Sequence, residues 1–256
     1  MKENKNIAII FAGGKGSRMG SSVPKQFLKI YGRDIIIHTL EKFQYNNNID
    51  LIYVGCIKEY IPYLEGLVKR FNITKIPIGG IIPGGNSGQD TIYRVLKKAQ
   101  EENFDNSIVL IHDGVRPLIN DKVINDNIKN VKKYGSSITV TPAFETPIIS
   151  LNGENVDEVI ERKTVYTAQA PQSFFLGDIV KAHEQVRNTD LGYSNPKIVD
   201  SCSLMKEIGN NVHLTLGNRG NVKVTTVEDY ITLLANLSIE DGARIFELSH
   251  KENSNE

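Results

Sequence analysis

The sequence predicts a doubly wound α/β fold with a mainly parallel sheet, and two patterns carry that prediction. Segments with apolar residues at helical spacing occur at 35–44, 60–71, 91–102 and 122–135. Between them lie short apolar runs typical of strands: IAIIF (7–11), LIYVGC (51–56), ITKIPI (73–78), SIVLIH (107–112) and SSITVTP (136–142). Strands that are apolar throughout and alternate with helices form parallel sheets covered on both faces. We expect the ligand at the carboxyl ends of these strands.

The alternation breaks from Glu145 to about Ser173. This stretch has short β-like pieces and an Asn-Gly pair at 152–153 that is typical of a hairpin turn. We interpret it as an excursion from the sheet: an arm, a lid or a dimer contact. The pattern then predicts helices at 174–186 and 201–209, strands at 212–216 and 222–226, and a last helix at about 227–248. The prediction is one domain over 1–240, with the excursion at about 145–173 and a flexible tail at 249–256.

The composition is that of a soluble globular protein and argues against several classes. Hydrophobic residues make up 40% and charged residues 23% of the 256 residues, with 30 basic and 30 acidic side chains. A zero formal charge disfavours a nucleic-acid-binding protein. The two cysteines, Cys56 and Cys202, lack the spacing of a zinc site or a disulfide framework and suit reduced thiols. No leader or membrane span is evident, so we expect a cytoplasmic protein without membrane contact.

The first candidate site is a glycine-rich, cationic loop after the first strand, FAGGKGSRMGSSVPKQF (11–27). It is not a P-loop, because Lys15 precedes Gly16, and its G-x-G-x-x-x-G spacing is not that of a dinucleotide-binding turn. Backbone N–H groups of the glycines, with Arg18 and Lys25 beside them, can bind the oxygens of a triphosphate. The alternative is a mobile glycine turn with solvated basic residues.

The second candidate site is IHDGVRP (111–117), at the end of the fourth strand. Asp113 can hold Mg²⁺ on phosphates, since this ion prefers one or two carboxylates plus oxygens of the substrate. Arg116 can orient that carboxylate or touch the ligand. The alternative for Asp113 is a cap on the next helix or turn. His112 could act as a general base, although a structural role is favoured.

The third candidate site is NRGNVKVTTVEDY (218–230). Lys223 lies in a predicted strand, where the pleat turns it opposite to its valine neighbours. A lysine that faces the end of the sheet needs an anionic partner. A solvent-facing strand lysine is the alternative. Glu228 and Asp229 suit the first turn of the last helix, because their charge complements the helix dipole.

Together these motifs resemble those of the methylerythritol phosphate and ribitol-5-phosphate cytidylyltransferases. The matching stretches are AGGKGSRMG (12–20), PKQF (24–27), HDGVRP (112–117), ET (145–146), Arg162 before APQSF, and NVKVT (221–225). They keep the family's order over about residues 6 to 235. The resemblance implies transfer of CMP from CTP to a polyol phosphate with release of pyrophosphate. It also implies Mg²⁺ as cofactor and a homodimer joined through the excursion.

Residue roles follow from the same resemblance. It implies that Arg18 and Lys25 grip the triphosphate and that Lys223 stabilises the charge at the α-phosphate, so these three are the catalytic set. Thr146 and Arg162 bind the acceptor, from across the dimer, and Asp113 is the metal ligand. The implied nucleotide-binding residues are Ala12, Gly13, Gly14, Gly16, Ser17, Gly84, Gly85, Asn86, Thr91, Asp113, Gly114 and Arg116. The nucleophile is a phosphate oxygen already ionised at pH 7, so no activating base is required.

Three departures from the family pattern concern nucleotide fit and acceptor choice. Gly88 stands in place of an arginine, Glu145 in place of an aspartate, and Ala170 in place of a threonine. The motifs favour ribitol 5-phosphate, or a related pentitol phosphate for cell-surface polymers, over the methylerythritol phosphate of isoprenoid biosynthesis. Two other classes stay open. One is a different nucleotide-sugar enzyme of similar fold, although no Asp-x-Asp motif of a glycosyltransferase is present; the other is an inactive binding module.

Overall fold

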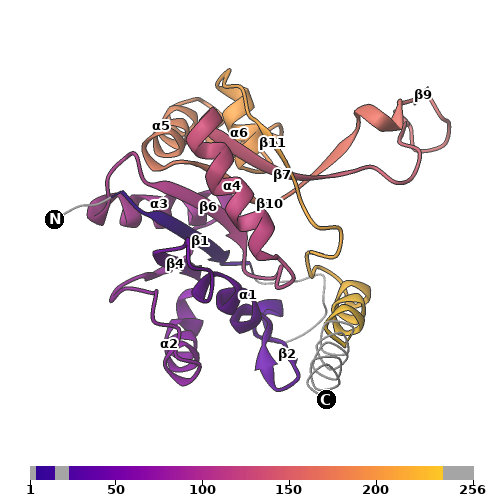
Figure 1. The fold of residues 1–256 in the computed structure, drawn as a ribbon. Helices are drawn as coiled ribbons and strands as arrows, with labels where there is room; N and C mark the ends of the chain where they lie inside the picture. The colour runs from indigo at the N-terminus through magenta and orange to yellow at the C-terminus, as the bar shows by residue number, and fades with distance from the viewer. Residues whose placement is uncertain (1–3, 15–22, 239–256) are drawn as a thin grey trace, which may run out of the picture.

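The computed structural model describes residues 4–14 and 23–238, and a seven-stranded sheet forms their centre (Figure 1). The strand order is β11-β7-β10-β6-β1-β4-β5. Every neighbouring pair is parallel except the two that involve β10, which runs antiparallel to β6 and β7. The strands are β1 (Asn6–Ala12), β4 (Leu51–Cys56), β5 (Ile81–Pro83), β6 (Ile108–Asp113), β7 (Ser136–Pro142), β10 (Tyr166–Phe175) and β11 (Leu214–Leu216). The predicted doubly wound, mainly parallel fold is confirmed.

Helices cover both faces of this sheet. One face carries α1 (Ile35–Gln44), α2 (Ile61–Arg70) and α4 (Asp121–Tyr134), and the other carries α3 (Gly88–Glu102), α5 (Leu176–Arg187) and α6 (Ser201–Glu207). The pleat of β1 explains the division, since Ala8 and Ile10 pack into the first apolar cluster and Ile7 and Ile9 into the second. Both clusters are fully buried, as expected for a parallel sheet between two helical layers.

Two predicted strands are wrong. Residues 73–78 form no strand, and β5 begins later, at Ile81. Lys75 N–H donates to the side chain of Gln44 instead of to a strand, and Pro77 has no N–H to donate. Residues 222–226 are also outside any ladder, although Val224 is fully buried and its N–H donates to Val115 O at 3.0 Å.

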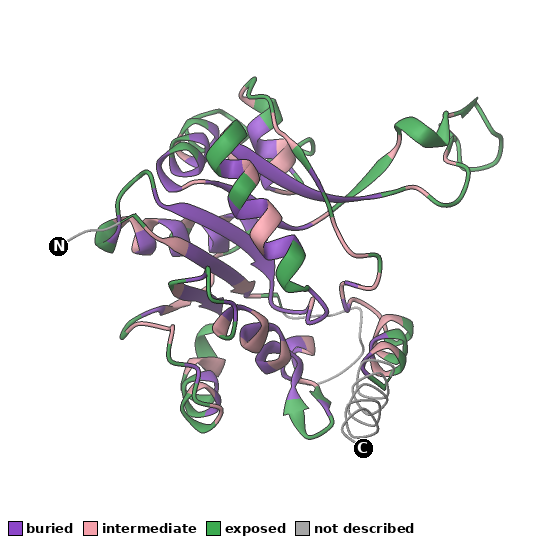
Figure 2. Cartoon of the chain, in the orientation of Figure 1, coloured by how far each residue is buried: buried purple, intermediate pink, exposed green. Residues whose placement is uncertain are grey.

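The excursion is shorter than predicted, because β10 takes residues 166–173 back into the sheet. Phe174 and Phe175 extend this strand, so α5 begins at Leu176 and not at 174. What projects is the arm, residues 143–165, which holds the small hairpin of β8 (Ile148–Ile149) and β9 (Glu158–Val159). Figures 1 and 2 show the arm extending away from the body with almost its whole length exposed. The Asn-Gly pair lies in the turn of this hairpin, with Gly153 at φ +76°.

The last helix covers a small third cluster. Residues 227–238 are helical, and Leu233 and Leu237 pack on Ile30 and Ile35. Ile30 belongs to the hairpin of β2 (Lys29–Ile30) and β3 (Arg33–Asp34). Glu228 and Asp229 lie in the first turn as predicted. The rest of the predicted helix to 248 and the tail at 249–256 lie outside the described residues.

The structure also bears on the cysteines and on membranes. Cys56 and Cys202 are free thiols, as predicted. In residues 4–14 and 23–238, no helix combines the length and apolar character needed to cross a bilayer.

Candidate active site

A cleft of about 430 Å³ lies at the carboxyl ends of β1 and β6, where the fold predicts a ligand. Its floor is the end of β1, and one wall is the first turn of α3. The amino-terminal end of a helix attracts anions, because its free N–H groups and dipole point at the ligand. The cleft is lined by Phe11, Ala12, Gly13, Gly14, Lys25, Gln26, Gly85, Asn86, Ser87, Gly88, Thr91, Asp113, Val115 and Lys223.

Thr91 organises the glycine-rich side of the cleft. Its Oγ1 accepts a hydrogen bond from Gly85 N–H (2.9 Å) and donates to Ser87 O (2.9 Å). A Cβ atom on Gly13 would lie 3.0 Å from this Oγ1, and one on Gly84 would lie 3.3 Å from it. The two backbone segments therefore approach so closely that only glycine fits without displacement. The structure brings Gly13, Gly85 and Thr91 together in the lining of the cleft, whereas Gly84 contacts Thr91 from outside that lining.

Asp90 supports the same segment from the first turn of α3. Its Oδ2 accepts a hydrogen bond from Asn86 N–H (3.1 Å), and its Oδ1 accepts one from Arg187 of α5 (2.9 Å). Burial opposes ionisation of Asp90, but these hydrogen bonds and the charge of Arg94 outweigh it and lower the pKa of its carboxyl. Asp90 thus stays charged and ties the predicted nucleotide segment to α5.

Gln26 holds the glycine loop, and the sequence analysis missed it. Its side chain is 1% exposed, and Nε2 donates to Ala12 O (2.6 Å) and to Gly14 O (3.2 Å). Gln26 therefore joins the start of the loop to the 3-10 turn Lys25–Phe27 at its end. The signal was present in the motif PKQF, where a glutamine follows the predicted catalytic lysine. Gly16, Ser17 and Arg18 lie in 15–22, outside the described residues.

Asp113 joins the second and third candidate sites. Its Oδ1 lies 2.6 Å from Lys223 Nζ, and its Oδ2 accepts a hydrogen bond from Arg116 Nε at 2.8 Å. Asp113 is only 5% exposed. Burial alone would raise the pKa of its carboxyl, but the charges and hydrogen bonds of Lys223 and Arg116 lower it below its usual range. The carboxylate is therefore ionised, and each of its oxygens contacts one cation.

These contacts decide between the alternatives for both residues. The Asp113 side chain does not cap α4, whose N-cap is Asn120, with Oδ1 accepting from Val123 N–H. Lys223 lies in no strand, and although its side chain is 39% exposed it pairs with Asp113 and its Nζ lies 5.8 Å from the centre of the Phe11 ring. The predicted strand around it is wrong, whereas the predicted anionic partner is confirmed.

Arg116 also fixes the backbone that carries Lys223. Arg116 Nη1 donates to Asn221 O at 2.8 Å, and Asn218 Nδ2 donates to Leu118 O at 2.7 Å. Gly114 lies beneath the cleft and not in its lining: a Cβ there would lie 3.1 Å from that of Ala12. The segments 112–118 and 218–224 therefore form one bonded unit, which fixes the position of the Lys223 ammonium.

His112 has a structural role. The ring is fully buried, its Nε2 lies 3.0 Å from Arg116 O, and it packs edge-on against Phe43. Burial lowers the pKa of His112 to about 4, so the ring is neutral at pH 7 and Nε2–H donates to that carbonyl. It lines neither the cleft nor the cavity beside it.

A second cavity, of about 390 Å³, adjoins the cleft. The two share Phe11, Ser87, Gly88, Asp113 and Lys223. Arg116 faces only the second cavity, whose remaining wall comes from α3, from β10 and from the segment before α6. The Asp113–Lys223 pair therefore stands at the junction of two spaces, each large enough for part of a small ligand.

The two predicted acceptor-binding residues lie elsewhere. Thr146 and Arg162 are exposed on the arm, and neither is among the described residues that line the cleft or the second cavity. Arg162 donates to Phe144 O at 2.9 Å, a contact within the arm itself. Within this one chain, the structure does not bring them to Asp113.

Asp113 is the carboxylate that the predicted Mg²⁺ would use. In the described chain, no group of three or more His, Cys, Asp or Glu side chains could hold a metal ion. Asp113 is one hard carboxylate at the junction, and its oxygens have lone pairs beyond those used by Lys223 and Arg116. This fits Mg²⁺ that takes one protein carboxylate and the rest of its ligands from phosphates.

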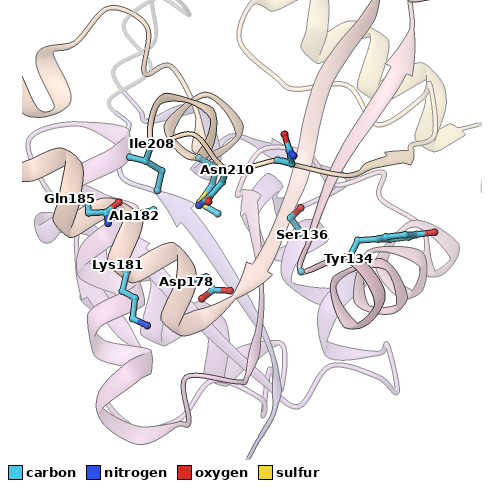
Figure 3. Close-up of a pocket in the computed structure, with 11 residues that line it drawn as sticks. Tyr134, Ser136, Asp178, Lys181, Ala182, Gln185, Ile208 and Asn210 are labelled. Carbon is cyan, nitrogen blue, oxygen red and sulfur yellow. The ribbon is translucent and has the colours of Figure 1, made fainter.

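A third cavity, of about 400 Å³, lies at the opposite edge of the sheet (Figure 3). Ser136, the first residue of β7, lines it together with Tyr134 and the α5 side chains Asp178 and Lys181. It contains none of the predicted site residues. The carboxyl edge is therefore the candidate active site.

Comparisons with known proteins agree with this assignment. The sequence model of the 2-C-methyl-D-erythritol 4-phosphate cytidylyltransferase family matches residues 6–239. The chain is 46% identical to ribitol-5-phosphate cytidylyltransferase of Vibrio parahaemolyticus, over 94% of this chain and 99% of the relative. It is 34% identical to a 2-C-methyl-D-erythritol 4-phosphate cytidylyltransferase of Clostridium botulinum, over 89% and 95%. A solved structure, the 4-diphosphocytidyl-2C-methyl-D-erythritol synthase of Anaerococcus prevotii, superimposes with a TM-score of 0.78 at 25% identity, over 92% and 96%.

Proposed function

The chain belongs to the 2-C-methyl-D-erythritol 4-phosphate cytidylyltransferase family and is a CTP-dependent nucleotidyltransferase, and we propose that it transfers CMP to ribitol 5-phosphate. One observation supports the transfer most directly. Lys223, paired with Asp113, stands where the glycine-lined cleft meets the second cavity. A cation at that junction can stabilise negative charge at a phosphorus atom of a nucleotide in the cleft while an acceptor occupies the cavity.

The reaction needs positioning and positive charge more than it needs a base. A phosphate oxygen of the acceptor attacks the α-phosphorus of CTP and forms a new P–O bond, while the α–β bond breaks and pyrophosphate leaves with its electrons. The acceptor phosphate has a second pKa near 6, so it is largely a dianion at pH 7. His112, the histidine nearest the site, is neutral, buried and bonded to the backbone, which agrees with a reaction that needs no activating base.

Each cation neutralises a different part of the negative charge of the triphosphate. Lys25 at the end of the loop and the first turn of α3 face the cleft, where they bind the triphosphate together with Arg18. Lys223 stabilises the charge that grows at the α-phosphorus as the new bond forms. Asp113 would hold Mg²⁺ together with phosphate oxygens, and the ion would supply further positive charge on the triphosphate. Thr91 and the glycines of the cleft hold the base.

The acceptor is assigned from the relatives. Two ribitol-5-phosphate cytidylyltransferases, from Vibrio parahaemolyticus and Streptococcus agalactiae, are 46% and 38% identical to this chain, against 34% for the enzyme of Clostridium botulinum. The ordering agrees with the preference already inferred from the motifs. The product would enter the synthesis of a cell-surface polymer such as a wall or capsule polymer, and the reaction would take place in the cytoplasm.

We further propose a homodimer in which the arm of one subunit completes the site of the other. Thr146 and Arg162 are the acceptor-binding residues in this proposal. The arm supports it in two ways. It exposes apolar side chains with no cover in the described chain, such as Leu151, which is 86% exposed. It also carries Arg162, a cation suited to phosphate, away from the cavities of its own chain.

A pyrophosphate-release assay with a panel of acceptors tests the proposed function. Ribitol 5-phosphate should give the highest kcat/KM with CTP, above xylitol phosphate, glycerol phosphate and 2-C-methyl-D-erythritol 4-phosphate. The second candidate acceptor is 2-C-methyl-D-erythritol 4-phosphate, because the matching family carries its name. A higher kcat/KM for that acceptor would overturn the assignment to ribitol phosphate and leave CMP transfer in place.

A further inference from the structure

The segment that leads into α3 forms part of the wall of the cleft, and Asp90 supports it. Gly85, Asn86, Ser87 and Gly88 all line the cleft, and none of them is charged. A Cβ on Gly85 would overlap Asp90 Oδ2, so the carboxylate packs directly against this backbone. The same oxygen accepts the hydrogen bond from Asn86 N–H. A displacement of Asp90 would therefore displace the wall of the cleft.

Two arginines pair with Asp90, and they come from different elements. Arg94 Nη2 lies 3.0 Å from Asp90 Oδ2 and belongs to α3 itself, one helical turn further along. Arg187 Nη1 lies 2.9 Å from Asp90 Oδ1 and belongs to the last turn of α5. The two side chains are similarly exposed, at 47% and 41%. The pair with Arg94 moves with α3, whereas the pair with Arg187 fixes the start of α3 relative to α5.

Arg187 is itself held by two tyrosine rings. Its guanidinium carbon lies 4.5 Å from the centre of the Tyr93 ring and 5.5 Å from that of the Tyr193 ring. Both distances are within the range of a cation–π interaction. Tyr193 lines the second cavity, and its hydroxyl lies 2.6 Å from Nδ1 of the buried His183. Arg187 therefore joins the wall of the cleft, through Asp90, to the wall of the second cavity.

We propose that Arg187 is a positioning residue for CTP, which holds residues 85–88 in place by anchoring Asp90 to α5 and to the wall of the second cavity. The inference rests on the proposed function only in placing CTP in the cleft. Arg187 is not among the described residues that line either space, so it acts through Asp90 and not on the nucleotide. Because a ligand needs its binding groups in a fixed geometry, loss of this anchor should weaken the binding of CTP.

The test compares the Kd for CTP in Arg187→Met and Arg94→Met, measured by isothermal titration calorimetry without acceptor. Arg94→Met is the matched control, because each variant removes one positive charge from Asp90 and keeps an apolar side chain. The Kd should rise about 10-fold in Arg187→Met, since the anchor to α5 is lost. It should rise less than about 2-fold in Arg94→Met, because an exposed ion pair within one helix contributes little. The difference between the variants measures the anchor and not the charge.

Turnover gives a readout that a general loss of stability would not reproduce. Asp113 and Lys223 are held by Arg116 and not by Arg187, so kcat with saturating CTP should stay unchanged in Arg187→Met while the KM for CTP rises. Arg187→Lys should recover only part of the affinity. An ammonium does not reproduce the planar guanidinium that contacts a carboxylate and two rings at once.

The proposal is overturned if Arg187→Met raises the Kd for CTP no more than Arg94→Met does, or if kcat falls while the Kd stays unchanged. If Arg187→Met does not fold, Arg187→Lys is compared with Arg94→Lys, and equal Kd values would again overturn it. Lys25→Ala tests the placement of CTP separately, because Lys25 lines the cleft. An unchanged Kd in Lys25→Ala would refute that placement, whereas a raised Kd there without an effect at Arg187 would refute only the role of Arg187.

Discussion

The carboxyl edge of the sheet and the arm are built in opposite ways. At the edge, contacts join segments about a hundred residues apart in sequence: Asp113 pairs with Lys223, and Arg116 donates to the carbonyl of Asn221. On the arm, hydrogen bonds are local, such as Arg162 to Phe144 and Leu151 N–H to Asp157. The edge is buried and the arm exposed (Figure 2). The charged side chains that are held in a fixed geometry lie at this edge, because several elements of the fold bond to them there.

This difference separates the two halves of the proposed site. The groups assigned to CTP and to the transferred phosphoryl group meet within one chain. The groups assigned to the acceptor phosphate do not meet them, and would require the partner subunit. Changes at the edge should therefore affect turnover, and changes on the arm should affect acceptor binding.

The largest effect is expected at the junction of the two cavities. Lys223→Ala should lower kcat by about 100-fold or more, because it removes a charge aimed at the transition state; Lys25→Ala should do the same. Single-turnover kinetics with saturating CTP and acceptor would measure this. Lys129→Ala, on α4, is the control and should keep full activity. A variant with near-normal turnover and an intact fold would contradict the catalytic role of that lysine.

The next effect concerns Asp113 and the metal. Asp113→Asn keeps the size of the side chain but removes the charge that both cations and Mg²⁺ would use, so activity should fall by about 10-fold or more and recover partly at high Mg²⁺. EDTA should abolish pyrophosphate release by the wild type. Full activity in EDTA would contradict the metal role of Asp113 and limit it to its structural pairing with Lys223 and Arg116.

On the arm, Arg162→Ala should raise the KM for the polyol phosphate about 10-fold and leave the KM for CTP nearly unchanged. Arg162→Lys should rescue it poorly, since a point charge does not reproduce the planar fork of arginine. Mixing Arg162→Ala with Lys223→Ala subunits should restore part of the activity, because one hybrid site then has both native residues. Inactive mixed dimers, or a monomer in solution, would contradict a shared site.

The smallest expected effect is on the pH dependence of the free energy of unfolding. It comes from a buried histidine in the body of the molecule, because the arm contains no histidine. Burial lowers the pKa of His183 to about 3. The unfolded chain, with a histidine pKa near 6.5, therefore binds this proton first, and the free energy of unfolding should fall as pH drops below 6.5. Between pH 7 and 5 this loss is about 2 kcal/mol.

His183→Phe should remove that part of the pH dependence, measured by urea denaturation at several pH values. Tyr193→Phe is the control, because it deletes the hydroxyl that lies 2.6 Å from His183 Nδ1 and keeps the imidazole. The control should retain the slope of the wild type. An unchanged slope in His183→Phe would show that the ring is not held neutral in the fold.

The sequence predicts the fold well where structure depends on local periodicity. The helices and the strands β1, β4, β6 and β7 lie within two or three residues of their predicted positions, because burial of an apolar face leaves a visible pattern. Strand prediction fails where backbone pairing depends on a segment that is distant in sequence. Residues 222–226 have the composition of a strand and bury Val224, yet their single sheet-like bond is to Val115 O.

The candidate site follows the same division. Lys223 was predicted to need an anionic partner and Asp113 to hold a metal ion, and the structure pairs the two side chains. Gln26 was missed because a neutral amide has many possible roles, and only three-dimensional contacts show which groups it bonds. The return of β10 into the sheet was missed because Pro171 and the small residues around it do not read as a strand.

The single reversed strand has a consequence for how such enzymes can diversify. β7 ends, and β10 begins, at the edge of the sheet where the active site lies, so residues 143–165 form an insertion whose two ends are both anchored there. The insertion can lengthen, shorten or change its chemistry while the bonds among Asp113, Arg116 and Lys223 stay as they are. In the proposed dimer, part of the acceptor choice can therefore evolve on the arm while the nucleotide chemistry stays on the body. A chimaera that exchanges only this segment between relatives should inherit its donor from one parent and part of its acceptor preference from the other.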